Sequence, residues 1–448
     1  MIHITHTLTT CGKSYTFDIG GGGCEKRTSR IPTILEKDNV TIYCYGQDST
    51  GIYKDDTQLI LTLADGHGSI KGGRAVSYRL HELIINCILD IKDFILTNLK
   101  LKQYDIIKST LKTIFYNIDN SILYSDKLTS HYNSGGSTLV LVHKIIDDST
   151  GDLYTISSNV GDSSYLKIKN NSVTEISSEQ SCDNMEAVEQ YYNYCLENEV
   201  IPSKIILGRF NTEKGFKTPW IGNETIEPYL YTIQNGSYTL SPNTTIMKQM
   251  YQLAPIELKH TTFYNGGPQS IRGRLKNLKA LSEGNFPMEN YGSTINGDLQ
   301  MVSSFGDKSS KQKHNIMCTP HTHISKYTSQ DNDTHEFISS DGPMDCLTNN
   351  ELIRLFAYKD KQSMPMDLFC EFTEKSIDIQ ARLGGFNFVG SLPAWDDLSY
   401  WVVKTNSNES LLSRINNLEA QQKDLLEYAN KLTDTIKKTN KILDLLIT

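Results

Sequence analysis

The feature that most limits how this chain can fold is a buried-strand signal followed by two amphipathic helices and then by more strands. Residues 58–64 form a short apolar run with β character that stops at a turn, residues 65–68, with the sequence DGHG. Residues 74–98 and 104–123 carry apolar side chains at helical spacing and are predicted to pair antiparallel. The order strand, helix, helix, strands favours an α+β layered domain over a doubly wound one.

The rest of the chain gives weaker signals. An antiparallel meander is predicted for residues 137–143, 153–156 and 164–168, which turn residues separate. Helices are predicted at 184–198, 273–282, 348–359 and 364–383, and strand signals return at 384–403. Residues 1–40 are predicted to be irregular, with a flexible loop from Gly20 to Gly23. A phosphate-cradling role for that loop is disfavoured, because no Gly-Lys-Ser/Thr follows it.

Composition is typical of a soluble globular protein and argues against two classes of partner. The chain has 448 residues, of which 38% are hydrophobic and 21% charged, enough for one large domain with additions or for two domains. The net charge of −8 argues against broad nucleic-acid binding, which needs a basic surface. No apolar run is long enough to span a bilayer, and the first residues lack the pattern of a secretion signal. We therefore expect a cytoplasmic protein without nucleic-acid or membrane partners.

The cysteines are consistent with that setting. There are nine, scattered without a CxxC pair, which favours reduced thiols in a cytosolic compartment. Cys318, His321 and His323 lie close together and could suggest a soft-metal site. A polar loop is the favoured interpretation, because no second pair of ligands accompanies them.

The last part of the chain has a pattern of its own. From Leu411 onward there is no proline or glycine, and apolar residues recur at two seam positions over roughly five heptads. One seam holds Leu411, Leu418, Leu425, Leu432, Thr439 and Leu446, and the other Ile415, Gln422, Ala429, Ile436 and Leu443. Residues 408–448 are therefore predicted to form a coiled coil that makes the protein a homo-oligomer. A single amphipathic helix lying on the body of the protein is the alternative.

Aspartates after apolar runs are the residues best suited to chemistry. Mg²⁺ and Mn²⁺ prefer oxygen ligands, lower the pKa of bound water and clamp phosphoryl oxygens. Short acidic side chains in turns can therefore build a site for phosphate-ester hydrolysis. The chain offers, in order, Asp48, Asp65, Asp162, Asp341 and Asp396. Any one of them alone is better explained as a turn cap, and only the ordered series favours a common site.

These aspartates stand within seven motifs between residues 40 and 403. Two of them are Gly46-Gln47-Asp48 and Ala64-Asp65-Gly66-His67-Gly68. The others are Gly136-Ser137-Thr138, Asn159-Val160-Gly161-Asp162-Ser163, the stretch from Gly297-Asp298-Leu299 to Ser304-Phe305-Gly306-Asp307, Ser340-Asp341-Gly342-Pro343-Met344-Asp345, and Trp395-Asp396-Asp397-Leu398-Ser399. In type and order they resemble the motifs of the protein phosphatase 2C family, the metal-dependent PPM phosphatases.

The resemblance implies a fold and a domain plan. It implies a four-layer α-β-β-α sandwich, in which two antiparallel sheets are flanked by helix pairs and the metal cleft lies at one end. The phosphatase-type domain would cover residues 41–404, with a long insertion at about 181–290. The coiled-coil helix at 408–448 would follow it.

The resemblance also implies ligands for two Mg²⁺ or Mn²⁺ ions and possibly a third. Asp65 would bridge two ions, and the Gly66 carbonyl would ligate directly or through water. Asp341 with Asp396 would hold one ion, and Asp162 with Asp341 a possible third. The remaining metal candidate is Asp48, and weaker candidates are Gln47, Asp307, Asp345 and Asp397.

The implied activity is that of a metal-dependent serine/threonine phosphatase acting on phosphorylated proteins. A water bridging two ions would attack phosphorus in line. Asp65 and His67 would be the catalytic residues, with His67 as the general acid that protonates the leaving alkoxide. A histidine suits that role, because its ordinary pKa lies near neutral.

Departures from the family pattern keep an alternative open. Gln47 replaces a glutamate, which removes a charge from the ion site. Tyr43 stands roughly where an arginine commonly grips the phosphate, and Ser164 and Ser303 stand where other arginines are usual. The alternative is a catalytically weak or inactive phosphatase-like binding or scaffold protein that oligomerises through its C-terminal helix.

Overall fold

The strand predicted at residues 58–64 is β6 (Gln58–Ala64), the middle strand of a seven-stranded sheet. In the computed structural model, the described residues are 2–25, 32–37, 39–124, 135–169, 172–182, 184–206, 227, 229–242, 263–264, 267–268, 294–295, 299–328, 331, 334–347, 349–383, 388–389, 392–393 and 397–409. The seven-stranded sheet has the order β20 (His321–Lys326), β10 (Leu153–Val160), β9 (Leu139–Ile146), β6, β5 (Asp48–Lys54), β4 (Val40–Tyr45) and β3 (Thr33–Lys37).

A six-stranded sheet packs against the seven-stranded one. Its order is β1 (Ile2–Thr10), β2 (Lys13–Cys24), β24 (Leu398–Glu409), β21 (His335–Ser339), β11 (Ser164–Lys169) and β12 (Ser172–Glu175). Every strand pair in both sheets is antiparallel. The predicted pair of antiparallel sheets is therefore confirmed.

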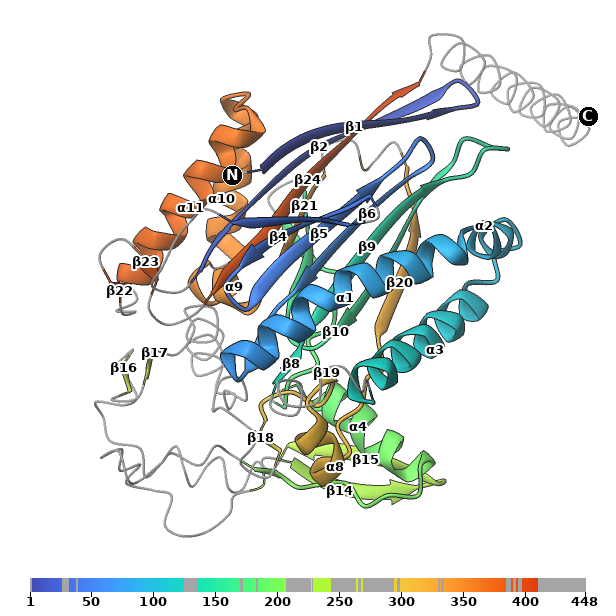
Figure 1. The fold of residues 1–448 in the computed structure, drawn as a ribbon, viewed down its shortest axis with the longest axis vertical. Helices are drawn as coiled ribbons and strands as arrows, with labels where there is room; N and C mark the ends of the chain where they lie inside the picture. The colour runs from blue at the N-terminus through green and yellow to red at the C-terminus, as the bar shows by residue number, and fades with distance from the viewer. Residues whose placement is uncertain are drawn as a thin grey trace, which may run out of the picture.

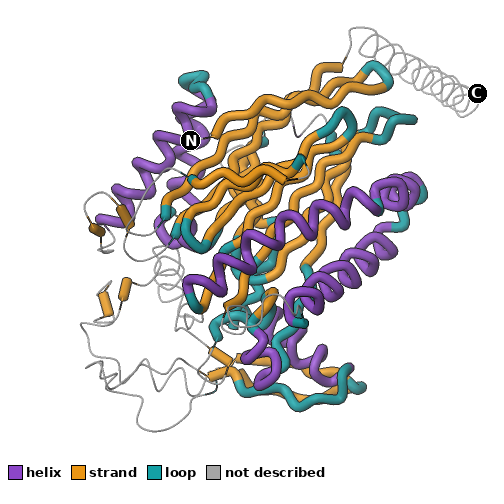
Figure 2. The backbone as a smooth tube through the Cα atoms, viewed as in Figure 1, coloured by secondary structure: helices purple, strands orange, loops and turns teal. Residues whose placement is uncertain are grey.

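Helices cover the outer face of each sheet (Figures 1 and 2). The seven-stranded sheet is covered by α1 (Ile70–Asp90), α2 (Lys92–Lys100) and α3 (Tyr104–Leu123), and the six-stranded sheet by α9 (Asp341–Cys346), α10 (Asn349–Lys361) and α11 (Met366–Leu383). The α1–α3 and α9–α11 groups pack on separate hydrophobic clusters, and a third cluster lies between the sheets. The described residues thus form an α+β layered domain, as the order of predicted elements indicated, with the two sheets and outer helices that the family resemblance implied.

Shorter elements gather at one end of the sandwich, below the sheets in Figure 1. One group is the three-stranded sheet of β7 (Gly66–Gly68), β8 (Gly135–Ser137) and β19 (Phe305–Gly306). Beside it lie α4 (Met185–Glu197), α8 (Lys308–His314) and the hairpin of β14 (Tyr229–Gln234) and β15 (Ser237–Pro242). The remaining strands are β13 (Ile205–Ile206), β16 (Phe263–Tyr264), β17 (Gly267–Pro268), β18 (Thr294–Ile295), β22 (Phe388–Val389) and β23 (Leu392–Pro393).

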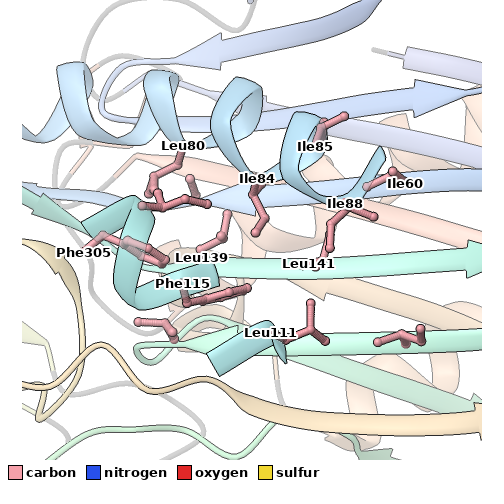
Figure 3. Close-up of a cluster of buried hydrophobic side chains, with 14 of the residues drawn as sticks. Ile60, Leu80, Ile84, Ile85, Ile88, Leu111, Phe115, Leu139, Leu141 and Phe305 are labelled. Carbon is pink, nitrogen blue, oxygen red and sulfur yellow. The ribbon is translucent and has the colours of Figure 1, made fainter. Parts of the chain in front are cut away.

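The alternation of side chains along β6 explains why this strand is apolar on both faces. Ile60 packs in the cluster under the helices, whereas Leu61 and Leu63 pack in the cluster between the sheets. Figure 3 shows Ile84 and Ile88 of α1 directed toward the sheet that carries Ile60. A strand covered on both faces needs apolar side chains at successive positions, which is why it appears as an unbroken apolar run.

The expectation that residues 1–40 are irregular is wrong. Residues 2–24 form β1 and β2, and residues 33–37 form β3, so the sandwich begins before residue 41. Gly20 to Gly23 lie inside β2 rather than in a loop. They are small because neighbouring groups approach closely: a Cβ on Gly20 would lie 2.5 Å from the Cys370 sulfur, and one on Gly21 would lie 2.7 Å from the Trp401 ring.

The predicted meander at 137–168 is correct only in part. β9 and β10 pair antiparallel, but β11 belongs to the six-stranded sheet and pairs with β21 and β12. The chain therefore crosses from one sheet to the other between Val160 and Ser164. Gly161, with φ of +96°, takes a backbone conformation there that other residues rarely adopt.

Other predicted segments have mixed outcomes. The helices expected at 184–198, 348–359 and 364–383 are α4, α10 and α11. Residues 318–323 are not a polar loop: Cys318 packs in the hydrophobic cluster under α1 and α3, and His321 and His323 belong to β20.

All nine cysteines are free thiols. Three predictions fall outside the described residues, wholly or for the most part. They are the helix expected at 273–282, the insertion at 181–290 and the coiled coil at 408–448. In the described part, no helix has the length and apolar composition required to cross a membrane.

Replacing Gly21 with alanine is predicted to destabilise the sandwich. The added Cβ meets the buried ring of Trp401, whose Nε1 donates a hydrogen bond to the Thr62 carbonyl of the other sheet at 3.1 Å. Overpacking of this kind costs about 1–3 kcal/mol. Urea unfolding of Gly21→Ala should show a lower midpoint with an unchanged m-value. Thr5→Ala, on the exposed face of β1, is the control. It should change the free energy of unfolding by less than about 0.5 kcal/mol. Equal urea midpoints for the two variants would contradict this prediction.

Candidate active site

Strand ends from both sheets bring the predicted aspartates to one end of the sandwich. Asp65 follows β6 and Asp48 begins β5, both in the seven-stranded sheet. Asp162 lies where the chain crosses between the sheets, and Asp341 follows β21 of the six-stranded sheet. Asp397 directly precedes β24. Side chains from distant parts of the sequence therefore share one location because the strand ends share it.

The backbone of Asp65 is held from both sides by the Gly136-Ser137-Thr138 motif. Its amide donates to Thr138 Oγ1 at 3.1 Å, and its carbonyl accepts from the Thr138 amide and the Ser137 hydroxyl, each at 2.9 Å. Thr138 Oγ1 also lies 2.6 Å from the Ser163 hydroxyl, next to Asp162. The Asp65 and Asp162 motifs are thus tied together through one threonine.

Ser399 makes a second connection between motifs. Its hydroxyl donates to Asp48 Oδ2 at 3.0 Å, and its amide donates to Ser340 Oγ at 3.2 Å. The Ser340 amide returns a hydrogen bond to the Ser399 carbonyl at 3.0 Å. The early acidic motif, the Asp341 motif and the last motif are therefore joined at one buried serine.

Asp48 is buried among other carboxylates. Burial, and after it the nearby Asp397 carboxylate, raises the pKa of Asp48 to about 8. Asp341 raises this pKa further, whereas hydrogen bonds with Ser340 and Asp65 oppose the rise. Asp48 therefore lies behind Asp65 in a region where negative charges are crowded and poorly hydrated.

Asp162 and Asp341 form the front of the same acidic region. Burial, followed by the charge of Asp341, raises the pKa of Asp162. Asp341 Oδ1 is buried and has no hydrogen-bond partner among the described residues. A buried carboxylate oxygen without a donor is costly unless a cation or water satisfies it.

The residues present fit a hard divalent cation in their chemistry. Neighbouring carboxylates that raise the pKa of Asp48 and Asp162, together with the unsatisfied Asp341 oxygen, are the environment that Mg²⁺ or Mn²⁺ stabilises. Within the described part of the chain, however, no three Asp, Glu, His or Cys side chains lie close enough together to hold one ion. Asp396 is outside the described residues, and of Asp345 only the backbone, in α9, is described.

His67 and Asp307 form a hydrogen-bonded pair beside the carboxylates. His67 Nε2 lies 2.6 Å from Asp307 Oδ2, and the two side chains are 21% and 9% exposed. Burial lowers the pKa of His67, but Asp307, and to a smaller extent Asp162 and Asp341, outweigh burial, so the pKa is raised. His67 Nδ1 has no hydrogen-bond partner among the described residues. One ring nitrogen is therefore held by Asp307, and the other is buried without a hydrogen-bond partner among the described residues.

The position of Asp307 is fixed by its own motif and by Asp119 and Lys311, which the sequence analysis did not single out. Ser304 Oγ donates to Asp307 Oδ2 at 2.6 Å. Asp119 of α3 accepts from the Gly306 amide at 2.8 Å and from Lys311 Nζ at 2.5 Å. Asp119 falls on the buried face of α3, so an acidic residue within an apolar helical stripe was the available sequence signal.

The site contains an open cleft of about 660 Å³. The lining residues are Gln47, Asp65, Gly66, His67, Gly68, Thr138, Asp162, Leu299, Gln300, Met301, Asp307, Ser309, Ser310, Lys313 and Asp341. Of the predicted site residues, the structure thus places Gln47, Asp65, Gly66, His67, Asp162, Asp307 and Asp341 on one cleft. Sequence analysis missed Lys313, although it lies in the basic segment 308–314.

Several departures from the family pattern have structural explanations. Tyr43 packs edge-on against Trp401, with ring centroids 6.0 Å apart, and belongs to the core between the sheets. Asp397 accepts a hydrogen bond from the Gln47 amide at 2.7 Å, and the Gln47 side chain donates to the Ser69 carbonyl at 3.4 Å. Ser303 and Ser164 are buried. None of these side chains brings positive charge to the cleft.

Comparison with known proteins finds similarity in structure but not in sequence. No protein-family model and no curated protein matches the sequence. The serine-threonine phosphatase 2C from Toxoplasma gondii is 11% identical; the match covers 90% of this chain and 99% of that one, with a TM-score of 0.49. The catalytic domain of the serine/threonine phosphatase PstP, solved with two manganese ions, is 12% identical over 88% of this chain and 99% of that one, with a TM-score of 0.39.

A third match is the serine/threonine phosphatase Stp1 from Staphylococcus aureus. It is 13% identical, and the match covers 85% of this chain and 98% of that one with a TM-score of 0.38. At such low identities, what this chain does must be argued from its own cleft.

The crowding at Asp48 predicts that its removal stabilises the protein when divalent ions are absent. Because the folded-state pKa of about 8 lies above the ordinary value of 3.8, ionisation costs stability progressively as pH rises from about 4 through 8. Asp48→Asn keeps an acceptor for Ser399 and removes that cost. In a chelator, it should be more stable than wild type by on the order of 2 kcal/mol at pH 8 and by much less at pH 5.

Thermal unfolding at both pH values, with and without Mn²⁺, measures this effect. Asp55→Asn is the matched control with the opposite sign. Burial raises the pKa of Asp55, but hydrogen bonds from Thr57 and Gln58 outweigh burial and lower it to about 2. Asp55 therefore stabilises the fold above its ordinary pKa, and this contribution is lost as pH falls toward 2. If Asp48→Asn were less stable than wild type in chelator at pH 8, the crowding argument would be wrong.

Proposed function

We propose that this chain is a divalent-metal-dependent phosphatase that hydrolyses phosphoserine or phosphothreonine in proteins. The observation that carries the proposal is the presence, in one cleft, of the Asp65, Asp162 and Asp341 carboxylates facing the His67–Asp307 pair. The first group suits a hard cation, and the second suits proton donation. Phosphate-monoester hydrolysis needs both, and the ordered motif resemblance to the PPM family favours the same chemistry.

Asp65, Asp162 and Asp341 would hold Mg²⁺ or Mn²⁺, with the Gly66 carbonyl, Asp48 and Asp396 as further candidates. Bound there, the ions supply neutralisation of the phosphoryl oxygens and activation of water. Thr138 and Ser137 keep the Asp65 backbone in place during the reaction. Two or more carboxylates at one end of the sandwich thus provide the negative charge that such ions require.

His67 acts on the leaving group. Asp307 holds Nε2 and favours the protonated imidazole. Nδ1, which has no other partner among the described residues, would then be the proton donor to the leaving group. Transfer of that proton to the departing serine or threonine oxygen avoids the release of a strongly basic alkoxide. The role of Asp307 is to position the ring and to maintain its charge.

A second candidate is a phosphatase-like protein that binds phosphorylated partners with little or no turnover. It is favoured by a specific observation: among the described residues no three ligand side chains converge on one ion. Gln47, in place of a carboxylate, and a described cleft lining without arginine point in the same direction. Activity and metal binding must therefore be measured separately.

Substitution of Asp65 tests the proposed function directly. Wild-type protein should hydrolyse a phosphothreonine peptide with Mn²⁺, and Asp65→Asn should lower kcat/KM by at least about a hundredfold because a ligand carboxylate is lost. Asp90→Asn, at the exposed end of α1, is the control and should match wild type. Calorimetric Mn²⁺ titration of the same proteins separates the two candidates. Binding without hydrolysis supports the second candidate, and absence of both would rule out the proposal.

Asp307→Asn should reveal the dependence of His67 on its partner. Asparagine tolerates the positive φ of 50° at this position, so the backbone should persist. Removing the charge lowers the pKa of His67, so the protonated, donating form is lost at lower pH. We expect kcat for a phosphothreonine peptide to fall by about ten- to a hundredfold and the alkaline limb of its pH profile to move to lower pH.

The leaving group provides an internal control for that variant. p-Nitrophenolate departs without protonation, so hydrolysis of p-nitrophenyl phosphate should be much less affected by Asp307→Asn and by His67→Gln. An equal loss on both substrates would indicate general damage to the cleft rather than loss of proton donation.

A further inference from the structure

One wall of the cleft is a short helix that none of the seven sequence motifs includes. Helix α8 (Lys308–His314) begins directly after Asp307, and its residues Ser309, Ser310 and Lys313 line the cleft. Lys313 follows these serines by four and three positions, so the three side chains share one helix face. Asp65 and His67 line the same cleft as this helix face.

The three lysines of α8 have different environments. Lys311 is only partly exposed and donates to Asp119 at 2.5 Å and to the Ser304 carbonyl at 2.7 Å. Lys308 Nζ lies 5.9 Å from the centre of the Tyr124 ring. Lys313 is exposed toward the cleft, and it is the only lysine or arginine among the described residues that line it.

The cleft carries an excess of negative charge, which a lysine on its wall would partly offset. Four carboxylates line it, Asp65, Asp162, Asp307 and Asp341, and they repel a phosphoryl dianion. Divalent ions would offset part of this charge. Of the nearby cations, Arg74 is bonded to the Gly46 carbonyl and to Glu25, and it is not among the cleft-lining residues. Tyr43, which stands roughly where the resembled family commonly has an arginine, packs its ring in the core.

We infer that Lys313, with the Ser309 and Ser310 hydroxyls, binds the phosphoryl group of the substrate and supplies the positive charge that arginine does not supply here. This inference rests on the proposed function, because it assigns the recognition wall of the same cleft. A lysine is a point charge on a flexible stem and lacks the two-pronged geometry of a guanidinium. It should therefore add affinity for the dianion in the ground state and the transition state alike, and so act mainly on KM.

The test compares Lys313→Gln, Lys313→Arg and the matched control Lys308→Gln, which alters the same helix outside the cleft. With Mn²⁺ and a phosphothreonine peptide, Lys313→Gln should raise KM about tenfold with kcat changed less than about threefold. Lys313→Arg should restore most of the loss, and Lys308→Gln should match wild type. Raising the salt concentration should weaken wild type more than Lys313→Gln.

A binding measurement makes the inference independent of turnover. Inorganic phosphate, titrated calorimetrically into each Mn²⁺-loaded protein, should bind Lys313→Gln about tenfold more weakly than wild type. Thermal unfolding checks that each variant is folded, and the exposure of Lys313 favours this.

The outcomes separate the two claims. If wild type hydrolyses the peptide and Lys313→Gln has the same KM and the same phosphate affinity, the inference is overturned and the proposed function stands. If no hydrolysis occurs but phosphate binding depends on Lys313, recognition by α8 is supported and the enzyme proposal fails. If wild type does not bind phosphate, or if Lys308→Gln weakens binding as much as Lys313→Gln, the inference is overturned.

Discussion

Repulsion between the buried Asp48 and the carboxylates around it is the constraint on which the rest of this structure depends. At one end of the sandwich, the charges of Asp397 and Asp341 raise the pKa of the buried Asp48, whereas a hydrogen bond with Asp65 opposes that rise. Holding like charges there is unfavourable, so the surrounding structure must fix them firmly. It does so through buried hydroxyls: Ser399 joins Asp48 to the Asp341 motif, and Thr138 joins Asp65 to the Asp162 motif. Such a site concentrates negative charge that a bound divalent ion would neutralise.

The proton-donating half of the cleft is supported from a different layer. Asp119, on the buried face of α3, holds the Gly306 amide and Lys311, and this fixes the loop that carries Asp307. Asp307 in turn holds His67. The helix layer over the seven-stranded sheet therefore does more than cover apolar surface, because it also fixes the orientation of the imidazole. The same loop continues into α8, so the residue that holds His67 and the proposed recognition wall belong to one continuous segment.

Much of the fold followed from periodicity. The unbroken apolar run of β6 and the helical spacing of α1 and α3 are local patterns, and burial on two faces or on one stripe produces them directly. The N-terminal strands were missed because four consecutive glycines usually indicate a flexible loop. Here they are small because α11 and Trp401 pack against them, and no local pattern reports a partner more than 300 positions away. The assignment of β11 was wrong for the same reason, because its sheet is set by pairing with β21.

By itself, the sequence determined the type and order of the chemical groups: acidic residues after apolar runs, a histidine two residues after Asp65, and serine or threonine beside them. Only the tertiary structure decided which of these groups meet. It placed Asp307 against His67, Asp119 behind Asp307, and Lys313 on the wall of the cleft. It also packed the Tyr43 side chain against the core between the sheets. The physical reason is that local sequence fixes the direction of a side chain relative to its own strand or helix, whereas convergence depends on long-range strand pairing and layer packing.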